Sequence, residues 1–213
     1  MIKHPEQTAK NDLLHKILAD RIEHHAPYIC GRVLDIGCGQ MPYVHLFDRV
    51  TKRRYIGIDI QNHKGSVTAS GEALPFRDAV FDSVLCLQVL EHVREPKQLF
   101  SEAYRVLKSN GVMLLTTPFM WGIHSEPVDF YRYTPYAIEY LSGQAGFNIK
   151  SIEADSGFWL LMSLRLNYYL SRLNTRLLNP LFWLLQRIGY LLDRLDTRYS
   201  RRDTTGFTTI LIK

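Results

Sequence analysis

The chain has 213 residues, of which 46% are hydrophobic and 22% charged, a balance that suits one globular domain spanning 1–213 with a sizeable core. Its three cysteines, Cys30, Cys38 and Cys86, lack metal-ligand spacing, and the first residues lack the pattern of a signal peptide, so we expect reduced thiols in a cytoplasmic protein. The net charge of +5 is unevenly placed, because residues 156–202 hold eight arginines and two aspartates.

The periodicity of apolar residues predicts strands that alternate with helices. An amphipathic helix is expected over 8–26, and later helices over 44–47, from Glu95-Pro96 to about 110–111, and from Thr134-Pro135 to Gly146. Strands are expected at 32–36, 55–60, around 67, 81–87, 112–117, 147–153 and 207–212. This alternation predicts an α/β fold with a mostly parallel, doubly wound sheet.

A glycine turn follows the first of these strands, in the run V-L-D-I-G-C-G-Q-M at 33–41. Such a turn lets a ligand approach the backbone closely. A dinucleotide site would need a third glycine where Pro42 stands, which leaves an adenosyl-amino-acid cofactor or a plain tight turn. Asp59 follows Gly37 by 22 residues and ends the next strand, a distance that suits binding of a ribose diol, although a solvated aspartate would also fit there.

Four motifs together resemble those of class I S-adenosylmethionine-dependent methyltransferases of the type 11 kind. They are V-L-D-I-G-C-G, G-I-D-I, the run from G-E-A-L-P-F to L-Q-V-L-E-H-V, and R-V-L-K-S-N-G-V-M-L-L-T-T-P. The resemblance covers residues 30–154 and the final strand. It implies a Rossmann-like sheet of seven strands, in which the last strand is antiparallel and lies between the fifth and the sixth.

The resemblance also implies that S-adenosyl-L-methionine is the cofactor and assigns residues to it. Each assignment follows the motif at that position: the methionine part would contact Asp35, Gly37, Cys38, Gly39 and Gln88, the ribose Asp59, and the adenine Ile60, Ser70, Gly71 and Glu72. Met41 stands where many members have a third glycine, and Ser70 where members often have an aspartate.

His92 follows the fourth predicted strand, near the expected position of the methyl group. Because an unperturbed histidine has a pKa near ~6.5, His92 is a candidate base for an acceptor that must lose a proton. The alternative is that L-E-H-V closes a helical turn and that His92 only bonds to backbone.

The segment after the fifth strand is rich in polar and aromatic residues. Its run H-x-x-P-x-D-F-Y-R-Y-T resembles methyltransferases linked to polysaccharide and lipid-linked sugar pathways. His124, Asp129 and Arg132 are candidates for binding hydroxyls or phosphate, and Trp121 or Tyr131 for stacking on a sugar. Alternatively, Asp129 and Arg132 form a structural ion pair. The sequence contains no metal-binding constellation such as H-E-x-x-H, so no metal is expected.

Residues 157–200 form an apolar, arginine-rich insertion before the last strand, predicted as two helices broken at Asn179-Pro180. Its longest uncharged run has ten residues, too few to span a membrane. It could pack in a homodimer, cap a large acceptor or lie peripherally on a membrane.

The sequence thus predicts a methyltransferase for a small or lipid-linked acceptor, with a sugar oxygen as the leading candidate. A nucleic-acid methyltransferase is disfavoured, because Q-V-L-E occupies 88–91 where an N-P-P-Y motif would stand. A non-catalytic, cofactor-binding scaffold is the remaining alternative.

Overall fold

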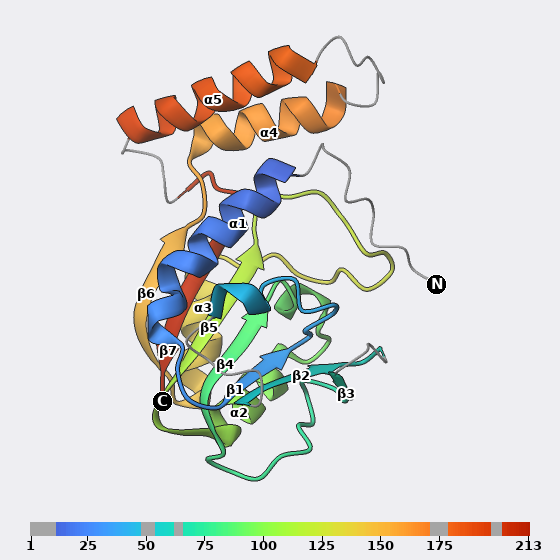
Figure 1. Ribbon diagram of the computed structural model, residues 1–213, viewed down its shortest axis with the longest axis vertical. Coiled ribbons are helices and arrows are strands. Elements are labelled where there is room, and N and C mark those ends of the chain that lie inside the picture. The colour runs from blue at the N-terminus through green and yellow to red at the C-terminus, as the bar shows by residue number, and fades with distance from the viewer. Residues whose placement is uncertain (1–11, 48–53, 62–65, 171–178, 197–201) are drawn as a thin grey trace.

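The protein is built around one seven-stranded sheet, seen in a computed structural model that describes residues 12–47, 54–61, 66–170, 179–196 and 202–213 (Figure 1). The strand order is β3-β2-β1-β4-β5-β7-β6. Neighbouring strands from β3 to β5 are parallel, whereas β7 is antiparallel to both β5 and β6. The predicted fold and the place of the last strand are therefore confirmed. The strands are β1 (Val33–Ile36), β2 (Tyr55–Asp59), β3 (Ser66–Thr68), β4 (Phe81–Leu87), β5 (Leu107–Pro118), β6 (Asn148–Ala154) and β7 (Gly206–Ile212).

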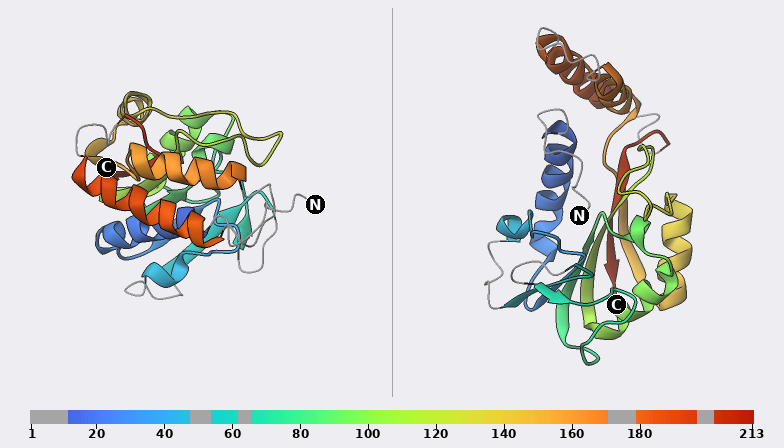
Figure 2. Two further views of the ribbon diagram at one scale, coloured as in Figure 1. Left: turned by 90° about the horizontal axis from the view of Figure 1, so that it is seen from above. Right: turned by 90° about the vertical axis from the view of Figure 1, so that its right-hand side faces the viewer.

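Helices cover both faces of the sheet (Figure 2). On one face lies α1 (Asp12–His25), and on the other lie α2 (Pro96–Val106) and α3 (Pro135–Ala145). Successive residues of β1 alternate between the two cores, because side chains of a strand point to opposite faces: Val33 packs with α1, and Leu34 and Ile36 pack with α2 and α3. Short 3₁₀ turns occur at Ala26–Tyr28, Val44–Phe47 and Leu90–His92.

Helix ends that carry local sequence signals lie where the sequence predicts them, whereas one expected helix end is wrong. The Thr134 side chain accepts a hydrogen bond from the Ala137 amide at the start of α3, and Gly146, with φ 98°, ends that helix. However, α2 ends at Val106 instead of near 110–111, and β5 begins at once with Leu107, which pairs with Phe81 of β4. Apolar periodicity could not separate these cases, because Leu107 would be buried in either conformation.

The insertion forms a helical hairpin of α4 (Phe158–Leu170) and α5 (Asn179–Leu195), hereafter the hairpin. The predicted break at Asn179-Pro180 coincides with the start of α5, where proline is well suited to the first turn. Residues 171–178 lie outside the described part of the chain, and so do the side chains of Arg172, Arg176, Arg198 and Arg201. No described helix is both long and apolar enough to cross a membrane.

The hairpin lies at the end of the molecule toward which the arrows of β4 and β5 point (Figure 1). It is docked through a small apolar cluster that joins α4 to α1, made by Ile17, Leu160 and Leu164. The Asp193 carboxylate on α5 accepts hydrogen bonds from the amides of Gly157 and Trp159 at 2.8 and 2.9 Å. One carboxylate from α5 therefore caps the start of α4.

Candidate active site

The glycine turn after β1 has the conformation that close approach of a ligand requires. Gly37 and Gly39 both lie in the left-handed region, with φ of 68° and 50°. A Cβ on Gly37 would clash with the Val89 side chain, whereas a Cβ on Gly39 would meet nothing within 4 Å. Gly37 is therefore needed for packing, and Gly39 leaves an open space beside the backbone.

Met41 stands where many family members have a third glycine, and its backbone has the left-handed conformation that glycine adopts readily. Its φ is 56°, in the left-handed region, and its amide donates to the Cys38 carbonyl at 2.7 Å. The Met41 side chain lies over Gly57 of β2, where a Cβ would come within 2.6 Å of the methionine methyl group. This departure from the family pattern is thus accommodated by a glycine on the neighbouring strand.

Two predicted cofactor carboxylates lie at the carboxyl ends of β1 and β2. Asp35 is buried and accepts a hydrogen bond of 2.6 Å from the Tyr55 hydroxyl. Burial raises the pKa of Asp35 to about 7; the Tyr55 bond opposes this shift, and the charge of Asp59 adds to it. Asp59 accepts bonds from the amides of Gly39 and Gln61, at 3.0 and 2.8 Å, and so joins the glycine turn to the end of β2.

The predicted adenine-side residues have different surroundings. Ile60 is 74% exposed, so its side chain presents a free apolar surface beside Asp59. Glu72 is held more tightly: its carboxylate accepts bonds from the Ser70 hydroxyl and from the Glu95 amide, at 3.2 and 2.9 Å. Gly71 packs against β1 and α2, where a Cβ would meet Ile36 at 2.8 Å.

Gln88 begins the loop after β4 with a left-handed φ of 56°. Its amide donates to the Thr116 side chain at 3.0 Å, which ties this loop to β5. The cofactor contacts remain predictions for all the residues assigned to it: Asp35, Gly37, Cys38, Gly39, Asp59, Ile60, Ser70, Gly71, Glu72 and Gln88.

A second group of polar side chains consists of Glu91, His92 and His124, hereafter the Glu–His–His cluster. Glu91 is fully buried, and neither of its carboxylate oxygens has a hydrogen-bond partner. The Nε2 atoms of His92 and His124 lie 3.7 and 3.8 Å from its Oε1 atom. Glu91 raises the pKa of His124 from its ordinary value; burial opposes this shift, and Asp129 adds to it.

Asp129 and Arg132 hold the loop that carries His124. The Arg132 guanidinium donates to both oxygens of Asp129, at 2.6 and 2.8 Å, and the His124 amide donates to Asp129 at 2.8 Å. Burial would raise the pKa of Asp129, but these hydrogen bonds lower it to about 2. The ion-pair reading of these two residues is therefore confirmed, and all four predicted catalytic residues lie in one neighbourhood.

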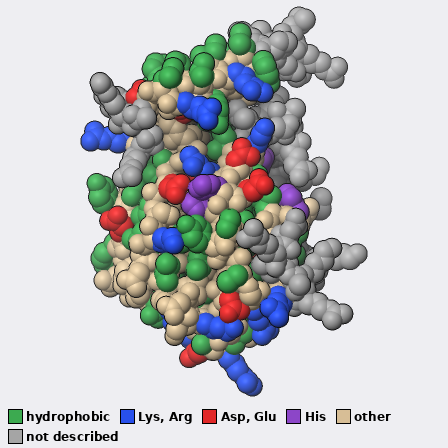
Figure 3. All heavy atoms as spheres, turned by 60° about the vertical axis from the view of Figure 1, so that its left-hand side comes forward, with side chains coloured by type: hydrophobic (Ala, Val, Ile, Leu, Met, Phe, Trp, Pro, Cys, Tyr) green, Lys and Arg blue, Asp and Glu red, His purple; other side chains and the backbone are tan. Residues whose placement is uncertain are grey.

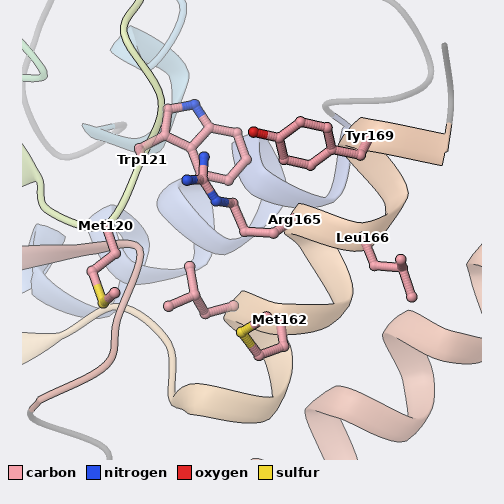
Figure 4. A pocket seen from close by; sticks show the side chains of 7 residues that line it. Met120, Trp121, Met162, Arg165, Leu166 and Tyr169 are labelled. Atoms are coloured by element: carbon pink, nitrogen blue, oxygen red, sulfur yellow. The ribbon is translucent and has the colours of Figure 1, made fainter.

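An apolar groove of about 600 Å³ runs between the loop after β5 and α4 (Figure 4). The Arg165 guanidinium lies 5.9 Å from the centre of the Trp121 ring, and the Tyr169 side chain lies beside them. The Trp121 carbonyl accepts a bond of 3.4 Å from Arg132, which connects this wall of the groove to Asp129 and its loop. The groove is lined by Met120, Trp121, Leu161, Met162, Arg165, Leu166 and Tyr169.

The sequence predicted no role for Glu91, which stands in the run L-E-H-V beside His92. Two hydrogen bonds from the amides of Phe130 and Tyr131 to the Glu91 carbonyl pull the later loop onto this turn, at 2.9 and 3.3 Å. The burial of the Glu91 side chain follows from that long-range contact, and no local pattern signals it.

Comparisons with known proteins agree with the sheet order and the glycine turn. Residues 34–115 match the family described as methyltransferase domain. The chain is 32% identical over 115 residues to an uncharacterised protein from Methanocaldococcus jannaschii, covering 50% of this chain and 53% of that one. It is also 32% identical over 121 residues to a probable S-adenosylmethionine-dependent methyltransferase from Mycolicibacterium smegmatis, covering 49% and 44%. The chain thus matches only about half of the length of these relatives.

Solved structures share the fold at low identity. A SAM-dependent methyltransferase from Archaeoglobus fulgidus superposes with a TM-score of 0.59 and 19% identity, over 93% of this chain and 94% of that one. The [4+2]-cyclase SpnF superposes with a TM-score of 0.65 and 17% identity, over 100% and 87%. Because the second is named as a cyclase, the fold alone does not specify the reaction. Residues 34–115 thus match the methyltransferase-domain family, and the sheet order and the glycine turn agree with that match.

Proposed function

We propose that the protein transfers a methyl group from S-adenosyl-L-methionine to a small or lipid-linked acceptor, with a sugar hydroxyl oxygen as the reacting atom. The observation that carries this proposal is one loop, 119–134, which contributes both to the Glu–His–His cluster and to the apolar groove. A polar group of side chains next to an apolar groove suits an acceptor with a polar reacting end and an apolar remainder.

The reaction needs positioning more than covalent help. The oxygen attacks the methyl carbon, the carbon–sulfur bond breaks, and the sulfur keeps the electron pair, so the cofactor already carries a good leaving group. The protein therefore has to hold the two reactants in line. We assign the cofactor to the glycine turn, with its ammonium group near Asp35 and its ribose on Asp59.

A hydroxyl acceptor also has to lose its proton. We assign this to the Glu–His–His cluster, in which His92 keeps its sequence-based role as a candidate proton acceptor. A His92→Ala variant should lose most of its turnover and keep its affinity for the cofactor. Unchanged turnover would remove His92 from this role.

The acceptor would lie in the groove, with Trp121 stacking on a sugar ring and Arg165 binding a phosphate. The hairpin supports a lipid-linked acceptor because its outer surface is both apolar and cationic, as Figure 3 shows at the top of the molecule. An Arg165→Gln variant should raise the KM for the acceptor and leave cofactor binding unchanged. Arg77→Gln is the matched control, since Arg77 is exposed between β3 and β4 and does not line the groove.

The proposal is tested by following a radiolabelled methyl group from the cofactor into three fractions: lipid extract, water-soluble glycans and nucleic acid. We expect label in the lipid extract and none with an Asp59→Ala variant. Label in nucleic acid would establish the rival enzyme function. Cofactor binding by calorimetry without transfer to any fraction would favour the scaffold alternative.

A further inference from the structure

We infer that the Glu–His–His cluster binds one divalent transition-metal ion of the zinc type. The ligand atoms are a carboxylate oxygen of Glu91 and the Nε2 atoms of His92 and His124, which lie within 4.8 Å of one another. Two imidazoles with one carboxylate form a ligand set that zinc uses in catalytic sites, where a fourth position stays open. Sequence spacing gave no hint of it, because the third ligand comes from a distant loop.

The strongest observation is the state of Glu91. A carboxylate buried without a partner is costly, and such groups are normally paired or bound to metal. Glu91 is 0% exposed and both of its oxygens are without hydrogen bonds. Arg132, whose charge interacts with that of Glu91, does not hydrogen-bond to it and donates to Asp129 instead. A divalent cation would supply the missing charge.

Both histidines turn their Nε2 atoms toward Glu91. The Nδ1 atom of His92 lies 2.6 Å from the Val128 carbonyl, which can only accept, so this nitrogen donates; in the neutral imidazole, Nε2 then keeps its lone pair. The Nδ1 atom of His124 lies 3.2 Å from the Gly122 carbonyl and 3.4 Å from the Asp129 carboxylate. Backbone carbonyls and carboxylates at the second imidazole nitrogen are typical partners of metal-binding histidines.

The spacing needs only a small adjustment. Ligand atoms on a tetrahedral zinc ion lie about 3.3 Å apart, given bonds of about 2.0–2.1 Å. Glu91 and the two Nε2 atoms are separated by 3.7 and 3.8 Å. The two distances to Glu91 therefore have to shorten by about 0.4–0.5 Å for an ion to bind.

A second group in the described residues, His24, His25 and Glu153, also has metal-compatible spacing. It is a weaker candidate because Glu153 already faces Arg21 at 3.6 Å and is 36% exposed. This group therefore provides an internal comparison for the experiment.

An ion at the Glu–His–His cluster would have a clear catalytic consequence, which rests on the proposed function. The open position would bind the acceptor hydroxyl and lower its pKa, so that the proton leaves to solvent before oxygen attacks the methyl carbon. With an ion bound, the two histidines would act as its ligands, and the role of His92 as proton acceptor would apply to the metal-free protein alone.

The experiment is calorimetric titration of the intact, chelator-treated protein with zinc chloride, without S-adenosylmethionine. We expect one tight site, bound at least 10-fold more weakly by Glu91→Gln and by His124→Gln, and unchanged in His24→Gln and in the exposed His45→Gln. X-ray absorption at the zinc edge should show two imidazoles, and one in His92→Gln. Magnesium chloride should not compete, since oxygen ligands suit that ion better.

Failure to bind zinc, or equal affinity in Glu91→Gln and the wild type, would overturn the inference. Loss of binding in His24→Gln with retention in Glu91→Gln would assign the ion to the other group and also overturn it. Circular dichroism establishes that each variant is folded. Because S-adenosylmethionine binding is measured separately, failure of the metal site and failure of the methyltransferase proposal are distinguishable.

Discussion

At the scale of single residues, the two glycines of the cofactor turn have separable roles. Gly37→Ala should lower the free energy of unfolding by about 2–4 kcal/mol, because the new methyl group adds a clash with Val89 to the left-handed strain. Gly39→Ala should cost only about 1 kcal/mol, since nothing lies within 4 Å of its Cβ, but the methyl group would occupy space needed by the cofactor. Urea unfolding and calorimetry with S-adenosylmethionine measure the two effects. Equal losses of stability would contradict this division.

Asp35 makes stability depend on pH. Its folded pKa of about 7 lies above its ordinary value of 3.8, so the folded state binds more protons between these values and stability falls as pH rises through this window. The slope contributed by this group is at most about 1.4 kcal/mol per pH unit. In Asp35→Asn that contribution should vanish.

The measurement is urea unfolding at several pH values between 4 and 8. Buried Asp155, whose pKa burial raises to about 6, contributes in the same direction, but it is present in both proteins and cancels in their difference. Parallel stability curves for Asp35→Asn and the wild type would show that Asp35 does not titrate in this range.

At the scale of elements, the hairpin depends on a cap supplied from one helix to the other. The carboxylate of Asp193 accepts three amide bonds, from Gly157, Trp159 and Leu160. Asp193→Ala should lower stability by about 1–2 kcal/mol and accelerate hydrogen exchange at the start of α4. Asp196→Ala is the matched control, because its described bond is to the Trp159 ring nitrogen. An equally large loss of stability in Asp196→Ala would indicate that removal of a negative charge, and not removal of the cap, lowers the stability.

The elements that the sequence predicted well carry their own local signals. Thr134 and Gly146 bracket α3, and the alternation of apolar residues placed all seven strands. The start of β5 at Leu107 and the burial of Glu91 were not predictable, because each depends on a partner far along the chain. The sequence placed these four residues after the fourth and fifth predicted strands: His92, His124, Asp129 and Arg132. Because the ends of parallel strands meet at one edge of the sheet, it predicted that they share this edge, but not which side chains are in contact.

At the scale of the whole molecule, the hairpin gives one end an apolar and cationic surface. Leu184, Ile188, Leu191 and Leu195 form an exposed stripe along α5, between 44% and 74% exposed. Arginines alternate with aromatic rings on the neighbouring stripe, as where Arg187 lies 4.8 Å from the Trp183 ring centre. Such a helix is suited to the interface of an anionic membrane.

We expect the intact protein to sediment with anionic vesicles and to remain in the supernatant with neutral ones. The double variant Ile188→Glu with Leu191→Glu should no longer sediment. The control is Val67→Glu, an exposed position on the edge strand β3, and this variant should still sediment. Vesicle-independent dimers, detected by light scattering and lost in the same double variant, would assign this surface to a second copy of the chain.

The place of β7 also determines the order in which the molecule can assemble. Among the described strands, β6 pairs only with β7, and β7 also completes the edge of β5. The chain reaches β7 only after the hairpin. Both β5 and β6 therefore lack this partner until the hairpin and β7 have been synthesised. The contacts that close the sheet are long-range, which makes them slow to form. During that interval β5 and β6 each have an unpaired strand edge, so aggregation of nascent chains is a hazard of this topology.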